Sequence, residues 1–124
     1  MRIVKKDDIT EPFVAPLGEK IYEMIGRPTE IGGTTNHSFV HVVIPPGKSS
    51  PKHYHKVSEE TYYVLAGRGR IIIDGKEKII SPGDACLIMP GEIHQIFVES
   101  DENLEFLTVS APAWVPTDTY IPED

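Results

Sequence analysis

The sequence predicts an all-β domain, built as a sandwich or small barrel of short strands. Eleven prolines and ten glycines are scattered along the 124 residues, which suits many turns and argues against long helices. Between these turns lie roughly eight to ten stretches in which polar and apolar residues alternate or β-branched residues cluster. The length fits one domain with a single core.

The first strand is expected at residues 19–25. On a strand, Glu19, Ile21 and Glu23 would share one face, and the residues between them would share the other. Gly26 and Pro28 stop the pattern early, so a one-turn helix is the alternative. Residues 26–36 are expected to form a loop.

The middle of the chain predicts three extended pieces. Residues 37–44 are rich in β-branched and aromatic side chains and end at a Pro-Pro-Gly turn, so they predict a strand. Residues 52–55 are expected to be short and extended, and residues 60–65 predict a further strand. Along that strand one face carries Glu60, Tyr62 and Val64.

The second half of the chain predicts a hairpin followed by more strands. Asp74-Gly75 is the strongest short hairpin signal available, since both positions of a tight hairpin turn favour residues that tolerate positive φ. The other turns are marked by Ser-Pro-Gly-Asp, by Pro-Gly and by a polar segment. The strands between them are expected at residues 68–73, 76–80, 85–89, 94–98 and 104–110.

Three regions are expected along the chain. Residues 1–37 form an N-terminal segment with one short strand, which packs on the barrel or on a partner. Residues 38–110 form the barrel. Residues 111–124 form a proline-rich tail, in which Trp114 and Tyr120 would hold the chain to the barrel; a frayed end is the alternative.

The charge and cysteine content exclude several classes of partner. A net charge of −7 repels the phosphate backbone of nucleic acids and anionic membrane surfaces. The single cysteine, Cys86, allows no internal disulfide, and it is most simply a core residue. The charged first ten residues do not resemble a signal peptide, and no apolar run is long enough to span a membrane. A cytoplasmic location is therefore expected.

Two segments carry the side chains that could bind a metal ion. His53 and His55 are two residues apart, so on a strand both imidazoles point the same way. Glu60 follows after a short turn and can add a carboxylate, and His94 could add a fourth ligand from another hairpin. Such a set suits iron, manganese, zinc, nickel or copper, with positions left open for water or substrate. The simpler interpretation is a chance His-x-His on a surface strand beside a solvated turn.

The spacing of these residues resembles the two signatures of the cupin superfamily. In the first signature, a glycine, His-x-His, a glutamate and a second glycine occur at fixed separations, and this chain matches it at Gly47, His53, His55, Glu60 and Gly67. In the second signature Gly83, Gly91 and His94 match, whereas Met89 replaces a proline and Val98 replaces an asparagine. The resemblance covers residues 38–110. It implies a double-stranded β-helix, or jelly-roll, barrel with His53, His55, Glu60 and His94 as the metal ligands.

Other candidate residues have a functional and a structural interpretation. Tyr62 shares the face of Glu60 and could orient a substrate through its hydroxyl, although packing is the favoured role. His41 could reach a pocket or be a satisfied histidine. Arg68 and Arg70 could receive an anionic substrate, or could lie on a solvated face. Because of strand alternation, the side chains opposite to His94 are expected outside the site; these are Gln95 and Phe97.

Three functions remain open from the sequence. The first is a small-molecule metalloenzyme of the dioxygenase, decarboxylase or sugar-isomerase type, the range of reactions that the resemblance to cupins implies. The second is a barrel that binds a small ligand or the metal without turnover. The third is a purely structural metal site, which predicts a closed coordination sphere and unfolding on chelation. The resemblance also implies a homodimer, in which residues 19–25 and the tail could complete a partner's sheet.

Overall fold

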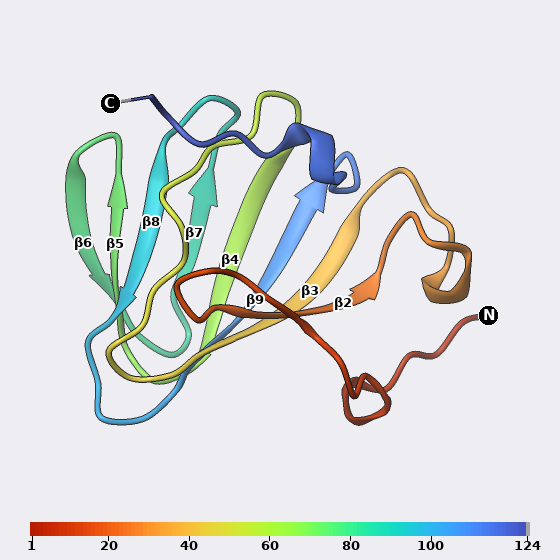
Figure 1. Ribbon diagram of the computed structural model, residues 1–124, viewed down its shortest axis with the longest axis horizontal. Helices are drawn as coiled ribbons and strands as arrows, with labels where there is room; N and C mark the ends of the chain where they lie inside the picture. Colours follow the sequence, from red (N-terminus) through yellow and green to blue (C-terminus); the bar gives the residue numbers. More distant parts are fainter. Residues whose placement is uncertain (124) are drawn as a thin grey trace.

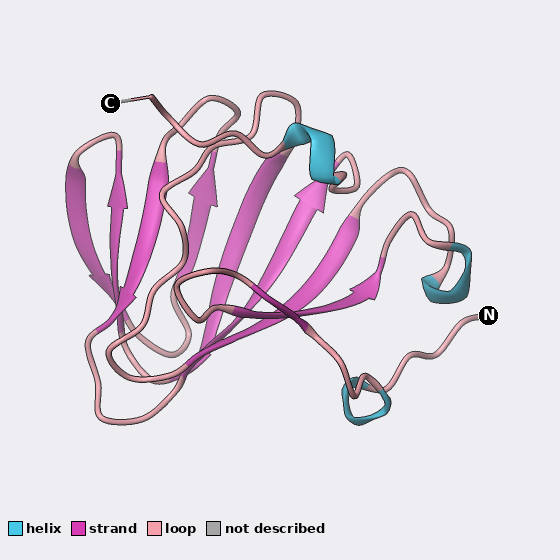
Figure 2. Ribbon diagram, viewed as in Figure 1, coloured by secondary structure: helices cyan, strands magenta, loops and turns pink. Residues whose placement is uncertain are grey.

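The computed structural model describes residues 1–123, and in this range the chain is almost entirely β (Figures 1 and 2). Three single-turn 3₁₀ helices accompany the strands, at Lys6–Asp8, Thr29–Ile31 and Pro116–Asp118. No helix among these residues is long and apolar enough to cross a membrane. The nine strands are β1 (Phe13–Val14), β2 (Lys20–Ile25), β3 (Ser38–Ile44), β4 (Glu59–Ala66), β5 (Gly69–Ile73), β6 (Lys76–Ile80), β7 (Ala85–Ile88), β8 (His94–Val98) and β9 (Leu104–Ala111).

The strands form two antiparallel sheets that enclose the core as a jelly roll. The larger sheet has the order β1-β2-β3-β9-β4-β7, and the smaller has the order β6-β5-β8. β3 and β9 lie side by side although about sixty residues separate them, which is typical of a jelly roll rather than of a simple meander (Figure 1). The all-β jelly-roll prediction is confirmed.

The predicted hairpin at Asp74-Gly75 joins β5 to β6. Asp74 has φ 48° and Gly75 has φ 79°, so both central residues of the turn have the positive φ that matches the twist of the strands. Gly67, at the end of β4, also has a positive φ of 75°, and a side chain there would meet the backbone of Asn103 and Leu104. The turn at Asp74-Gly75 therefore follows from local chain geometry, whereas Gly67 also answers to a contact that is distant in sequence.

The inward-facing residues change from apolar to polar along the larger sheet. At one end Ile44 pairs with Leu104, and both side chains are fully buried in the core. At the other end Ser110 pairs with Ser38 on one side and with Glu60 on the other, and all three are buried. The apolar end fills the space between the sheets. The polar end places hydrogen-bonding groups inside the barrel, where they need partners.

Both terminal segments pair within the chain itself. β2 pairs with β3, with a register shift between Glu23 and Ile25, so the expected strand at residues 19–25 is present in the chain's own sheet. In the tail, the backbone N–H of Trp114 donates to Ser38 Oγ at 3.2 Å. The Tyr120 ring stacks on Tyr54 with centroids 5.3 Å apart. The expected roles of Trp114 and Tyr120 in holding the tail are confirmed.

Candidate metal centre

The two histidines of the His-x-His pair are positioned by the segment that links β3 to β4. The backbone of His53 exchanges two hydrogen bonds with that of His94 on β8, with N–O distances of 3.0 and 2.9 Å. This bridge ties the linking segment to the smaller sheet and brings the histidines of both predicted motifs together. His55 and His94 are buried, and His53 is almost so.

Glu60 approaches the same point from the larger sheet. It lies at the start of β4, between Ser110 of β9 and Ile88 of β7, and its side chain faces inward. Ser110 donates its hydroxyl proton to Glu60 Oε2 at 3.2 Å, which fixes one oxygen of the carboxylate. The other oxygen, Oε1, lies 3.2 Å from His55 Nε2 and 3.3 Å from His94 Nε2.

All four side chains offer one ligand atom to a common point. The four atoms, from His53, His55, Glu60 and His94, lie within 4.8 Å of one another. Three nitrogens and one carboxylate oxygen in this arrangement can hold one divalent metal ion. The structure thus brings together the four candidate ligands of the two motifs.

Backbone carbonyl groups orient all three imidazole rings. His53 Nδ1 donates to Pro51 O at 2.8 Å, His55 Nδ1 to Asp118 O at 2.8 Å, and His94 Nδ1 to Glu92 O at 2.9 Å. A carbonyl oxygen can only accept, so each neutral ring carries its proton on Nδ1. Each Nε2 therefore presents a lone pair to the centre, which is the arrangement found around bound metals.

The centre of the cluster lacks a hydrogen-bond donor. Glu60 Oε1 and His94 Nε2 are buried and neither has a hydrogen-bond partner. With the protons on Nδ1, both atoms are acceptors, so their close approach is unfavourable unless a cation lies between them. A divalent metal ion satisfies both atoms at once, and the residues present fit such an ion.

The local electrostatics favour a negative Glu60 and a neutral His53. Burial acts to raise the pKa of Glu60, but the nearby imidazoles of His55 and His94 outweigh burial and hold this pKa well below its ordinary range. Burial first, and the neighbouring His94 second, lower the pKa of His53 to about 4. At neutral pH the cluster therefore presents a carboxylate and at least one uncharged imidazole, both suited to binding a cation.

Asp118 in the tail supports the turn between His55 and Glu60, and sequence reasoning did not identify it. Its buried carboxylate accepts backbone N–H groups of Lys56, Val57 and Ser58 at 2.9 to 3.2 Å. Its carbonyl accepts from His55 Nδ1, as described above. One residue thus shapes the turn and orients a ligand. Between 60 and 63 positions of the sequence separate Asp118 from these partners, so no local pattern could reveal the contact.

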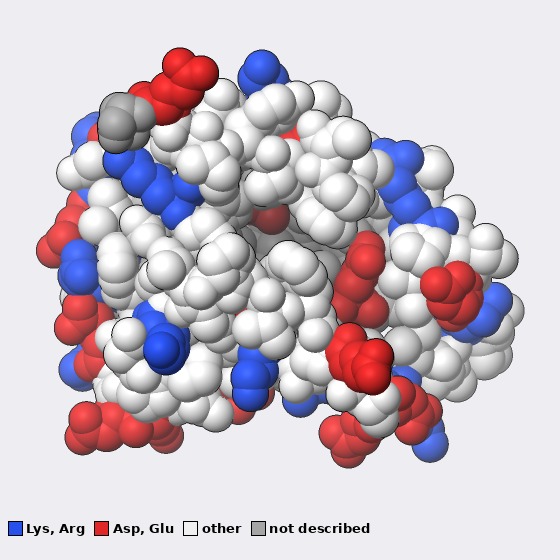
Figure 3. All heavy atoms as spheres, in the orientation of Figure 1, with Lys and Arg blue, Asp and Glu red and all other residues white. Residues whose placement is uncertain are grey.

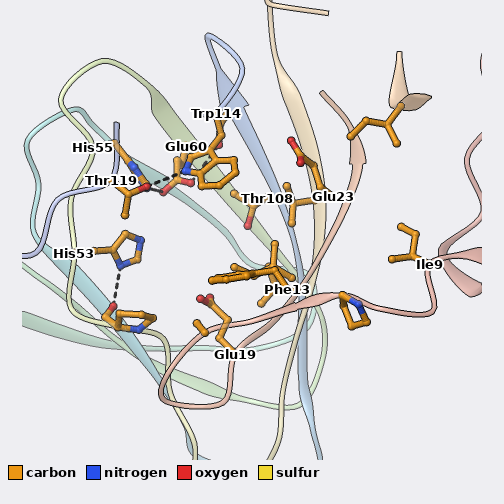
Figure 4. A pocket seen from close by; sticks show the side chains of 18 of the residues that line it. Ile9, Phe13, Glu19, Glu23, His53, His55, Glu60, Thr108, Trp114 and Thr119 are labelled. Carbon is orange, nitrogen blue, oxygen red and sulfur yellow. Dashed lines mark hydrogen bonds and ion pairs between the residues drawn. The ribbon is translucent and has the colours of Figure 1, made fainter. Parts of the chain in front are cut away.

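The cluster lies at one side of a cavity of about 460 Å³ (Figure 4). His53, His55 and Glu60 line this cavity, so a bound ion would be accessible to a small molecule from that side. The other walls come from the N-terminal segment, from β2 and β3, and from the tail. The face shown in Figure 3 is hollowed near its centre, with uncharged atoms around most of the hollow.

Glu19 is a second carboxyl group in this cavity, and its role was not predicted. It lies directly before β2, is 6 % exposed, and its carboxylate points into the cavity (Figure 4). Within residues 1–123 that carboxylate has no hydrogen bond or ion pair. Burial first, and the charge of Glu60 second, raise the pKa of Glu19 to about 7. The signal was the alternation at residues 19–25, because Glu19, Ile21 and Glu23 all line the cavity.

Tyr62 combines packing with a place in the cavity lining. Its ring lies 4.5 Å from that of Phe106 and 6.2 Å, edge-on, from that of His94. The side chain is buried, as the favoured packing role requires. Tyr62 also lines the cavity, and in the described part of the chain its hydroxyl has no hydrogen bond. A contact between that hydroxyl and a substrate is compatible with this position.

The remaining candidates lie away from the cavity. His41 Nε2 is 2.9 Å from Glu105 Oε1, so this histidine is satisfied. Arg70 contacts Glu99 and Glu77 at 2.6 and 3.0 Å on an exposed face, and Arg68 precedes β5 rather than sharing its face. Cys86 packs partly buried against the core. The two residues expected outside the site, Gln95 and Phe97, are absent from the cavity lining.

Comparison with known families agrees with the fold and the two motifs. Residues 40–110, more than half of the chain, match the Cupin domain family. The chain is a member of the cupin family. The match includes His53, His55, Glu60 and His94, although the family assignment does not by itself specify a reaction.

Three similar proteins illustrate the range of this cupin's relatives. An uncharacterized protein of Methanocaldococcus jannaschii is 32% identical over 124 residues, covering 99% of this chain and 98% of the relative. A Thermotoga maritima crystal structure, named a predicted oxalate decarboxylase, has a TM-score of 0.74 at 30% identity and covers 89% of this chain and 98% of that one. An uncharacterized Klebsiella pneumoniae protein with a double-stranded β-helix domain has a TM-score of 0.77 at 20% identity over 100% and 99% of the two chains.

Proposed function

We propose that this cupin is a metal-dependent enzyme that acts on a small organic molecule. One divalent transition-metal ion, of manganese, iron, zinc, nickel or copper, would be held by His53, His55, Glu60 and His94. The observation that carries the proposal is the convergence of buried acceptor atoms, without a donor between them, beside an open cavity. A bound ion would supply a Lewis acid, or a site for redox chemistry, at its open positions.

Two residues of the chain would act on the substrate itself. Glu19 lies in the same cavity, and burial raises its pKa above the ordinary value, so its carboxyl group could accept or donate a proton beside the metal centre. Tyr62 offers a hydroxyl that could hold a polar group of the substrate. The cavity volume of about 460 Å³ falls in the range of sites for small molecules.

The reaction classes in question are dioxygenase, decarboxylase and isomerase chemistry. Similarity to a protein named a predicted oxalate decarboxylase makes decarboxylation one reaction to test. The position of Glu19 is compatible with decarboxylation or isomerisation, since both need a proton moved to or from carbon. An oxygen-uptake screen of the metal-loaded protein would separate the dioxygenase class from the other two.

The main alternative is a cupin that binds a small ligand without turnover. Glu19 favours the enzyme, because a buried carboxyl group with a raised pKa beside a candidate metal centre is typical of groups that transfer protons. The structural alternative required a closed coordination sphere, whereas three of the four candidate ligands line the cavity. The openness of the site to the cavity therefore favours chemistry over a purely structural metal.

A substrate panel with a Glu19→Gln variant tests the proposal. The panel contains small carboxylates, diketones, thiols and sugars, tested with each metal. We expect turnover of at least one compound, a loss of about 10²-fold or more in Glu19→Gln, and unchanged metal content. Glu11→Gln is the matched control, because Glu11 lines the cavity but is exposed. A metal-loaded protein without turnover on any compound would favour the binding alternative.

A further inference from the structure

The cavity beside the metal centre has an unusual balance of charge. Phe13, Ile21, Val42 and Trp114 are among the many apolar side chains that line it. Its charged side chains, apart from the histidines, are all acidic. These are Glu11, Glu19, Glu23, Glu30 and Glu60, and no lysine or arginine of residues 1–123 lines the cavity.

The arginines that could have received an anion are engaged elsewhere. Arg70 donates to Glu99 Oε1 at 2.6 Å and to Glu77 Oε1 at 3.0 Å, and its guanidinium lies over the Phe97 ring. Arg68 donates to the carbonyl of Glu99 at 2.9 Å. Neither side chain reaches the cavity lining. The bidentate contacts by which proteins usually recognise carboxylates and phosphates are therefore missing from this site.

A bound metal ion does not make up for the missing lysine and arginine side chains. A divalent ion together with Glu60 leaves one net positive charge, and one further ionised carboxylate, from Glu19 or Glu23, cancels it. A carboxylate or phosphate placed there would have the metal ion as its only cationic partner and would lie among further carboxylates, which costs free energy. The uncharged polar groups in the lining, the Tyr62 hydroxyl and the buried Thr108 Oγ1 without a partner, suit an alcohol or carbonyl instead.

We propose that this cavity takes a small, mainly apolar molecule that is neutral or positively charged, and that it discriminates against carboxylates and phosphates. The apolar body would pack between the Phe13 and Trp114 side of the cavity and β2–β3, with its polar end toward Tyr62, Thr108 and the histidine cluster. The inference rests on the proposed function and narrows it, because a substrate without a carboxylate leaves dioxygenase or isomerase chemistry and not decarboxylation. Its charge selectivity does not depend on turnover.

Four probe molecules test this selectivity. Benzyl alcohol, benzylamine and benzoate share one ring and differ mainly in charge, and oxalate is a small dianion. Trp114 is the chain's single tryptophan and lines the cavity, so its fluorescence reports binding, and calorimetry provides a second readout. We expect the alcohol and the amine to bind at least about tenfold more tightly than benzoate to the metal-loaded protein. Oxalate should leave Trp114 fluorescence unchanged at the same concentrations.

A pair of variants assigns the selectivity to the cavity. Glu23→Gln removes a carboxylate of the lining and should improve benzoate binding about threefold or more relative to benzyl alcohol. Asp101→Asn removes an equal charge from an exposed turn outside the cavity and should leave the ratio unchanged. Equal or tighter binding of benzoate or oxalate would overturn the inference. Failure of all three ring compounds to bind would overturn it as well.

Repeating the titrations after metal removal separates this inference from the proposed function. Selective binding of the alcohol and the amine by protein that never holds metal would support the inference and contradict the metalloenzyme. Metal-loaded protein that turns over a carboxylate, and binds benzoate as tightly as benzyl alcohol, would support the metalloenzyme and contradict the inference.

Discussion

The carbonyl oxygen of Asp118 accepts a hydrogen bond from His55 Nδ1 at 2.8 Å, while the carboxylate of the same residue binds the backbone N–H groups of the following turn. This residue of the tail therefore fixes the direction in which His55 presents Nε2. It also closes the turn that carries the chain from His55 to Glu60. The tail is in this way a part of the candidate metal centre.

Replacing Asp118 with alanine should weaken both metal binding and folding. Loss of the carboxylate leaves up to three backbone N–H groups without their acceptor, and should cost about 2 to 3 kcal/mol of the free energy of unfolding. The backbone carbonyl of residue 118, which orients His55, would then be held less firmly, so metal affinity should fall about 10- to 100-fold. Chelator competition and urea unfolding measure the two effects. Thr117→Ala, at the exposed neighbouring position, should change neither metal affinity nor the free energy of unfolding. Equal values for the two variants would show that Asp118 does not support the metal centre.

Two glycines with similar backbone angles should respond differently to alanine. Gly67 and Gly75 have φ of 75° and 79°, but a Cβ at Gly67 would lie 2.8 Å from Leu104 Cα, whereas one at Gly75 meets nothing within 4 Å. Gly75→Ala should therefore cost only the backbone strain, about 1 kcal/mol. Gly67→Ala adds a collision with a fixed strand and should cost at least about twice as much in urea unfolding. Similar losses would show that the approach at Gly67 can relax.

The raised pKa of Glu19 should make the metal-free protein less stable as the pH rises. The ordinary pKa is 4.5 and the folded value is about 7, so the folded state retains a proton that the unfolded state has released. Below pH 4.5 the carboxyl group is protonated in both states and burying it costs no ionisation free energy. The free energy of unfolding then falls as the pH rises through 7. Above that pH the loss amounts to about 3 kcal/mol.

Glu19→Gln should remove this part of the pH dependence. In chelator-treated protein the variant should match the parent near pH 5 and exceed its free energy of unfolding at pH 8. Urea unfolding at the two pH values measures the difference. Glu11→Gln is the control at an exposed position and should keep the parent's profile. A Glu19→Gln variant that is no more stable than the parent at pH 8 would show that Glu19 does not titrate in this way.

The fold could be predicted from the sequence because its determinants are local. Alternation along residues 60–65 placed Glu60 and Tyr62 on the inward face, and Asp74-Gly75 marked a hairpin that the structure contains. The four residues of the candidate metal centre could be named because their spacing resembles the two cupin signatures; in the structure His53 and His55 lie in the segment between β3 and β4 and not on a strand. His94 followed from the second motif, and its backbone bridge to His53 explains why the two motifs meet.

The cavity walls could not be predicted because they depend on contacts distant in sequence. Glu19 lies in the cavity only because β2 pairs with β3 in the larger sheet, and Asp118 reaches His55 only because the tail folds back across the barrel. A sequence pattern shows which side of β2 is shared by Glu19, Ile21 and Glu23. It does not show whether that side meets solvent, a core or a cavity.

Metal content is the most direct test of the central claim that His53, His55, Glu60 and His94 bind one divalent ion. Elemental analysis should be made on the parent, on His53→Ala, and on His41→Ala as a control histidine outside the cavity, each purified with and without oxygen. Circular dichroism would confirm that each variant is folded. We predict about one transition-metal ion per chain in the parent and in His41→Ala, and about a tenth of that or less in His53→Ala. A parent protein that holds no more metal than His53→Ala under any of these conditions would contradict the account.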